Sequence, residues 1–140
     1  MDMIKKNKGF TLLELLVVMV IIGLLAGYVG PKYFNKLGES QVQAAKAQMN
    51  AFSKALDVYR LDHGAYPDQQ SGLNALITAP QSGSAKWKGP YLKKTIPKDP
   101  WDKMYIYRMP GENSEFDLIS HGADGRAGGA GDNADIIENP

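Results

Sequence analysis

The sequence of 140 residues contains no cysteine. A disulfide framework and thiolate chemistry are therefore excluded, although a chain without cysteine can work on either side of a membrane. The formal net charge is only +1. Because a nucleic-acid-binding protein normally carries a clear basic excess, we predict no nucleic-acid partner.

Catalytic signatures are also scarce. The two histidines, His63 and His121, adjoin a predicted helix end and a predicted strand end, so we interpret both as surface or capping residues. The sequence has no G-x-S-x-G, no phosphate-binding glycine loop before a helix and no H-E-x-x-H. Trp87 and Trp101 are expected to anchor the core or a loop. We therefore predict that the chain is not an enzyme.

What the sequence does have is a long apolar run near its amino end. Residues 10–30 are apolar apart from Thr11, Glu14 and three glycines. As a helix this run would rise about 31 Å, close to the roughly 30 Å hydrocarbon core of a bilayer. The three lysines within residues 1–9 indicate that the run starts on the cytoplasmic side. A secretory signal peptide would have a shorter run and a small-residue cleavage site after it.

A one-sided apolar stripe follows. Its steps of three and four residues predict an amphipathic helix over residues 38–63 that ends before Gly64. The stripe consists of Val42, Ala45, Met49, Phe52, Leu56 and Tyr59. Together with residues 10–30 it predicts one helix of about fifty residues. Pro31 should kink or loosen this helix because it lacks an amide hydrogen, the alternative being a helix end there.

Shorter elements are predicted after the long helix. Residues 71–79 predict a short helix capped by Ser71, and residues 80–103 are mostly loop. Residues 104–109 and 115–120 predict two strands that form a hairpin against the amphipathic helix. The fold class is therefore α+β, a long N-terminal helix whose second half carries a small antiparallel sheet.

The stretch after His121 is rich in glycine and acidic residues. Hard cations such as Ca²⁺ bind roughly six to eight oxygens, and glycines allow backbone carbonyls to contribute. The EF-hand pattern fails because Arg126 stands at its third position, and the G-G-x-G-x-D pattern fails at Asn133. A flexible acidic loop and a cation site therefore both stay open. The candidate side chains are Asp124, Asp132 and Asp135.

The stretch KGFTLLE, followed by the apolar run, resembles the type IV prepilin signal. The resemblance implies that a prepilin peptidase cuts after Gly9, so that residues 1–9 are a leader and Phe10 becomes N-methylated. The apolar helix then stays on the chain as a transmembrane and assembly element. Glu14 is implied to meet the new amine of a neighbouring subunit, the alternative being a tolerated carboxylate at the membrane surface.

Gly23 and Gly27 form a G-x-x-x-G pair, a spacing that lets helices approach closely in lipid. The signal is weak on its own, because glycine is common in spanning helices. With Glu14 and Pro31, these glycines are the candidate assembly residues.

Three further motifs, YPD…SGLNALITAP, GPYLKK.IPKDPWDK and DLISHGADG, resemble the major pseudopilins of type II secretion systems. The match runs from Lys8 to about Ile136 and implies a type IV pilin-like fold with a periplasmic head over residues 31–140. It also implies a structural calcium. Its side-chain ligands would be Asp124 and Asp135, with Asp132 as a further candidate and with backbone carbonyls near His121 and Arg126.

This resemblance implies a structural subunit that polymerises into the periplasmic pseudopilus and supports export of folded proteins across the outer membrane. The implied partners are other copies, the prepilin peptidase, minor pseudopilins, inner-membrane secretion components and, before assembly, membrane lipid. The chain would be a single-pass inner-membrane protein with its C-terminal domain in the periplasm. Two alternatives are a type IV pilin of a surface fibre and an anchored periplasmic binding domain that never polymerises.

Overall fold

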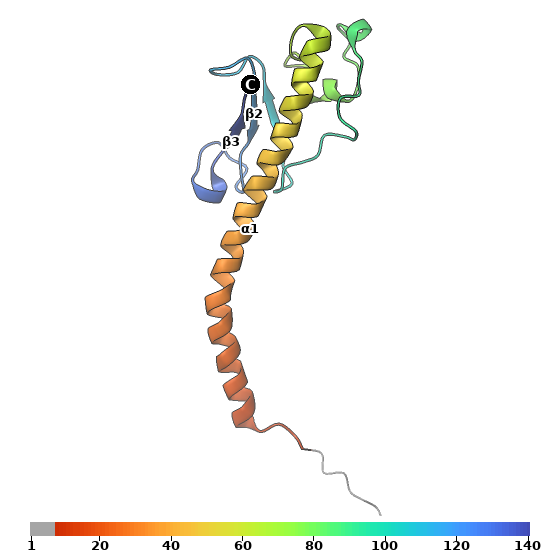
Figure 1. The fold of residues 1–140 in the computed structure, drawn as a ribbon. Helices are drawn as coiled ribbons and strands as arrows, with labels where there is room; N and C mark the ends of the chain where they lie inside the picture. Colours follow the sequence, from red (N-terminus) through yellow and green to blue (C-terminus); the bar gives the residue numbers. More distant parts are fainter. Residues whose placement is uncertain (1–7) are drawn as a thin grey trace, which may run out of the picture. The chain divides into compact units, whose positions relative to one another are not determined.

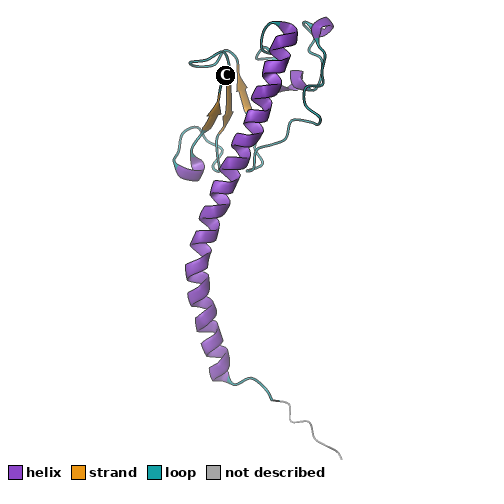
Figure 2. Ribbon diagram, viewed as in Figure 1, coloured by secondary structure: helices purple, strands orange, loops and turns teal. Residues whose placement is uncertain are grey.

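A computed structural model of the chain describes residues 8–140. The predicted leader, residues 1–9, lies outside this range except for Lys8 and Gly9. The helices and strands are α1 (Leu12–His63), the 3₁₀ turns η1 (Gly72–Leu76), η2 (Ser84–Lys86) and η3 (Gly131–Asn133), and the strands β1 (Ile106–Arg108), β2 (Asp117–Ser120) and β3 (Ile136–Glu138). Figures 1 and 2 show one long helix and one small sheet. The predicted α+β class is confirmed.

The chain divides into two compact units after Leu37, and the second unit covers residues 38–140. Helix α1 has 52 residues and contains Pro31. The helix therefore continues past the proline, and a helix end at this position is not observed. The predicted end is confirmed, because Gly64 has φ +83° and donates its N–H to the carbonyl of Arg60 at 2.7 Å. Glycine adopts this left-handed conformation without steric penalty.

The core of the second unit forms on the predicted stripe. Ala45, Met49 and Leu56 of α1 are fully buried, and Val42 is partly buried at the edge. The ring of Phe52 meets that of Tyr105 edge to face, with centroids 5.2 Å apart. Full burial of one such large apolar side chain contributes about 2 kcal/mol. The core is completed by Tyr59, Tyr66, Leu73, Leu76, Tyr107, Phe116, Leu118 and Ile136.

The sheet is antiparallel, with β2 between β1 and β3. Ile119 of β2 pairs with Ile106 on one side and with Ile137 on the other. The predicted hairpin is confirmed, with shorter strands than expected. Strand β3 was not predicted, because three residues are too few to show the alternation that marks a strand.

The prediction for residues 71–79 is only partly right. This segment forms the five-residue turn η1 instead of a longer helix, and the Ser71 side chain makes no cap hydrogen bond. Asp68 instead stabilises the turn before η1, since its Oδ1 accepts the Ser71 N–H at 2.7 Å. Trp87 anchors its loop as expected, because its Nε1–H donates to the Ala75 carbonyl at 2.8 Å.

Candidate functional site

The start of α1 is held by Glu14 and Thr11. The Thr11 N–H and hydroxyl both donate to Glu14 Oε2, at 2.8 and 3.0 Å, and the Glu14 N–H donates back to the Thr11 hydroxyl at 3.2 Å. This reciprocal pair is a capping box. It makes Thr11 the cap, so α1 begins at Leu12 and not at Phe10 as predicted. Gly9 and Phe10 lie before the helix and are exposed.

The large apolar side chains in the first part of α1, residues 12–30, are exposed throughout, from Leu12 (80 %) to Val29 (54 %). Among the described residues, α1 is the one helix long and apolar enough to cross a membrane. Such a continuous apolar surface is unfavourable in water, at about 25 cal/mol per Å². This part of α1 therefore requires lipid or other protein around it.

The glycines of this part of α1 present open surface. A Cβ added at Gly23, Gly27 or Gly30 would meet no atom within 4 Å. Contacts within the described chain therefore do not require glycine at these positions. The spacing of Gly23 and Gly27 suits close approach by a second helix.

The C-terminal loop, defined here as residues 121–135, is closed by its own hydrogen bonds. Asp135 Oδ1 lies 3.0 Å from His121 Nδ1, and Asp135 Oδ2 accepts the Gly128 N–H at 2.9 Å. The Gly128 amide first, and then His121, hold the pKa of Asp135 below its ordinary value. Asp124 Oδ1 accepts the Arg126 N–H at 3.0 Å. Asp124 and Asp135, two of the predicted ligands, therefore already stabilise the loop through hydrogen bonds within it.

The fit of this loop to a calcium ion depends on backbone oxygens. The residues that the structure describes contain no group of three or more His, Cys, Asp or Glu side chains that could hold a metal. The carboxylates of Asp124 and Asp135, together with backbone carbonyls of the glycine-rich loop, are nevertheless the hard oxygen donors that calcium binds. The third candidate, Asp132, points its carboxylate at Gly38 of α1. A cation here would take most of its ligands from the main chain.

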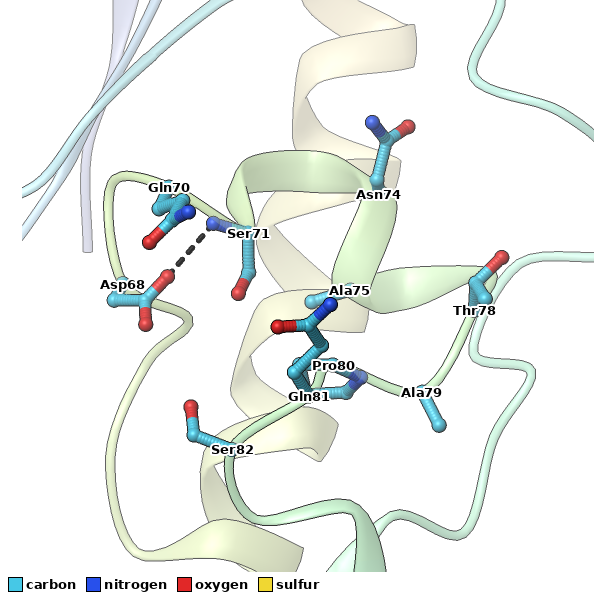
Figure 3. A pocket seen from close by; sticks show the side chains of 10 residues that line it. All are labelled: Asp68, Gln70, Ser71, Asn74, Ala75, Thr78, Ala79, Pro80, Gln81 and Ser82. Carbon is cyan, nitrogen blue, oxygen red and sulfur yellow. Dashed lines mark hydrogen bonds between the residues drawn. The ribbon is translucent and has the colours of Figure 1, made fainter.

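A shallow polar cavity of about 440 Å³ lies beside η1 (Figure 3). Its one ionisable group is Asp68, whose pKa the Ser71 backbone N–H lowers. None of the described residues that line the cavity is a histidine, lysine or cysteine. The hydroxyl groups of the cavity therefore have no histidine or lysine beside them, among the described lining residues, to act as a general base.

Comparison with known proteins identifies the family. The family described as "Type II secretion system (T2SS), protein G" matches residues 32–139, and the "Prokaryotic N-terminal methylation motif" matches residues 4–29. Type II secretion system core protein G of Pseudomonas aeruginosa is 44 % identical over 135 residues, which is 94 % of each chain. The Vibrio cholerae protein of the same name is 41 % identical over 97 % of this chain and 94 % of its own.

The chain belongs to the type II secretion system protein G family. The crystal structure of the major pseudopilin of enterohaemorrhagic Escherichia coli agrees, with a TM-score of 0.59 and 29 % identity over 74 % of this chain and 90 % of that one. The chain is thus a pseudopilus subunit of type II secretion with the pilin-like fold. The family is one of structural pseudopilins, and it favours this role over the two alternatives, a surface-fibre pilin and an anchored periplasmic binding domain.

Within this pseudopilin, the structure brings some predicted residues together and leaves others apart. Glu14 forms the capping box with Thr11, a partner that its charge alone did not suggest. The T-x-x-E spacing is the sequence signal that would have found it. His121 and Asp135 meet in the loop.

A buried aspartate of this pseudopilin was missed from the sequence. Asp99 is 4 % exposed and accepts the N–H groups of Trp101 and Lys103 at 3.0 and 2.8 Å. Its Oδ2 accepts the Ser120 hydroxyl at 2.8 Å, so Asp99 ties the loop before β1 to the end of β2. The order D-x-x-x-K within KDPWDK did not reveal this role, because the partner Ser120 lies on another element.

Proposed function

We propose that this pseudopilin polymerises through the first part of α1, with other copies of itself and with minor pseudopilins. The observation that carries the proposal is the exposed apolar surface of that helix, with open glycines at Gly23 and Gly27. Before assembly this surface lies in membrane lipid. The filament supports export of folded proteins across the outer membrane, together with inner-membrane secretion components.

The proposed location is the inner membrane, with a single pass and the second unit in the periplasm. The three lysines within residues 1–9 support this orientation, because positive residues stay on the cytoplasmic side. The apolar helix that follows them is long enough to span.

The proposed maturation is cleavage after Gly9 by the prepilin peptidase and methylation of the Phe10 amine. Two observations support it. The methylation motif matches residues 4–29, and Gly9 and Phe10 are exposed residues that lie before α1 and belong to no helix or strand. An exposed peptide bond outside regular structure is accessible to a peptidase.

The new amine of Phe10 would pair with Glu14 of a neighbouring copy. Such a pair is favourable only with good geometry, because both charges leave water. It would therefore fix the register between copies more than it adds affinity.

The proposed cofactor is one structural calcium in the C-terminal loop. Asp124 and Asp135 would supply carboxylate oxygens, and backbone carbonyls near His121 and Arg126 would supply the rest. With two carboxylates, the expected affinity is in the range of extracellular modules, with Kd of about 10⁻⁴–10⁻³ M.

The assembly role of Glu14 is tested by Glu14→Ala. Filament yield and secretion should fall sharply, because the pairing partner and the cap are both lost. Glu14→Gln keeps an acceptor for the Thr11 N–H but not the charge, so it should also fail to assemble. Glu112→Ala removes a carboxylate from the hairpin loop and serves as the control. Normal filaments from both Glu14 variants would contradict the proposal.

A further inference from the structure

Gly38 is the position where the C-terminal loop touches α1. It is buried, and an added Cβ would lie 2.6 Å from the Cγ of Asp132. Real Cβ atoms do not come this close to another atom, so the carboxylate fills the space that any side chain at position 38 would need. The other three glycines of α1 have open space at the same place. Gly38 is therefore the glycine of α1 that is explained by a contact within the chain.

Asp132 reaches Gly38 from a fixed backbone position. Its carbonyl accepts the Ala123 N–H at 2.9 Å, which joins the two arms of the loop. A Cβ added at Gly122, where φ is +66°, would lie 2.8 Å from the carbonyl oxygens of Asp132 and Ala134. The two arms are thus packed backbone to backbone. The Asp132 carboxylate cannot leave Gly38 without a rearrangement of the side chain or of the loop.

Farther along α1, the loop and the helix are separated. A groove of about 380 Å³ lies between Val42 and Lys46 of α1 and residues of the loop and of β3. Val42 and Lys46 are one and about two turns beyond Gly38 on the same side of the helix. The other lining residues are Gly131, Ala134, Asp135, Ile136 and Ile137. The loop and α1 thus line a groove at Val42 and Lys46, whereas at Gly38 the Asp132 carboxylate lies directly against the helix.

We infer that Asp132 is a positioning residue that clamps the C-terminal loop onto α1 at Gly38, and that it is not a metal ligand. The clamp couples the order of the loop to the turn of α1 that opens the second unit. Where the loop is ordered by a cation, this turn of the helix is protected as well. That last consequence rests on the proposed function, whereas the clamp itself does not.

Amide hydrogen exchange of the full-length chain in detergent micelles tests the clamp. Asp132→Ala should make the amides of residues 38–42 exchange roughly 5- to 30-fold faster, because local opening becomes easier by a corresponding factor. Asp102→Ala is the control, since it removes the same charge from a side chain that is 86 % exposed and lies outside the loop. It should leave these amides unchanged. Unchanged exchange in Asp132→Ala would overturn the inference.

Substitution of Gly38 gives a second, independent readout. Alanine is favoured over glycine in a helix interior, so at an open position Gly→Ala raises Tm. In the native background Gly38→Ala should instead lower Tm, because the new methyl group meets the Asp132 carboxylate. In the Asp132→Ala background the same change should raise Tm. An increase of equal size in both backgrounds would show that the two residues are uncoupled and would overturn the clamp.

Calorimetric titration with calcium separates the clamp from a metal site. Asp132→Ala should bind calcium within about threefold of the native affinity, whereas Asp124→Ala should weaken it at least about tenfold. An equal loss in both variants would make Asp132 a ligand and contradict the inference. If the native chain binds no calcium, the proposed cofactor fails, and the exchange and Tm results still decide the clamp.

Discussion

Glu14 is already bonded within its own chain before any neighbour is present. Its carboxylate accepts the N–H and the hydroxyl of Thr11, which satisfies donors that a helix start leaves open. A carboxylate has roughly four acceptor sites. The amine of a neighbouring Phe10 can therefore bond to Glu14 without displacing Thr11. One residue can then fix the start of its own helix and the register of the next subunit.

The buried carboxylate of Asp117 is expected to make the stability of the second unit depend on acid. The Glu112 N–H and the Ser114 hydroxyl bond to it at 2.8 and 2.7 Å and lower its pKa from the ordinary value of 3.8. A carboxylate with a depressed pKa stabilises the fold above its unfolded pKa, and this stabilisation is lost as pH falls through the folded value. Asp68 and Asp135, whose pKa values are also lowered, act in the same direction.

We therefore expect Tm to be constant near neutral pH and to fall below about pH 4. Asp117→Asn should lower the free energy of unfolding at pH 7 by about 1–3 kcal/mol, and it should flatten the acid dependence. Asp102→Asn is the control, because the Asp102 side chain is 86 % exposed. Denaturant titrations at pH 7 and pH 3 measure both effects. An unaltered acid dependence in Asp117→Asn would contradict this role.

At the scale of elements, the helix was predictable and the short strands were only partly so. The repeat of apolar residues over α1 is long enough to fix its type and its end at Gly64. Strand β3 has three residues and depends on pairing with β2 for its conformation. A local pattern cannot predict an element whose stabilisation comes from a distant partner.

The same limit applies to the candidate site. The motifs around Gly9, Phe10 and Glu14 are local, so the resemblance located them without a structure. The contact between Gly38 and Asp132 joins residues far apart in the chain, and no spacing rule links them. The hydrogen bond from the Gly128 N–H to Asp135 depends on a left-handed conformation of Gly128, which the sequence permits but does not specify.

Strand β3 offers a matched pair for testing the importance of this element. Ile136 is 8 % exposed and belongs to the core, whereas its neighbour Ile137 is 55 % exposed. Ile136→Ala should lower the free energy of unfolding by about 2–4 kcal/mol, and Ile137→Ala should change it by no more than about 0.5 kcal/mol. Urea denaturation of the two variants gives the comparison. Equal losses of unfolding free energy in the two variants would contradict the placement of Ile136 in the core.

At the scale of the whole chain, the proposed maturation would change the charge of the amino end. Residues 1–9 contain three lysines and one aspartate, a local charge of +2, so the chain changes from +1 to −1 when they are removed. The proposed leader would thus carry the positive charge that favours a cytoplasmic start of the helix. Its removal would create the Phe10 amine, which the proposed pair with Glu14 requires.

Calcium is expected to stabilise the folded second unit, because a ligand that binds only the folded state adds to its stability. Calcium at about ten times Kd should raise Tm by about 5 °C relative to a chelator-treated sample. The shift should disappear in Asp124→Ala. Elemental analysis of the purified protein checks for the bound metal. An unchanged Tm together with no bound calcium would contradict the proposal of a structural calcium.

If processing precedes assembly, the mass of the amino terminus in isolated filaments will show it. Every assembled copy should begin at Phe10 and carry one methyl group on its amine. Unprocessed chains should remain in the membrane fraction. Filaments built from copies that retain residues 1–9, or that lack the methyl group on Phe10, would contradict this order of events.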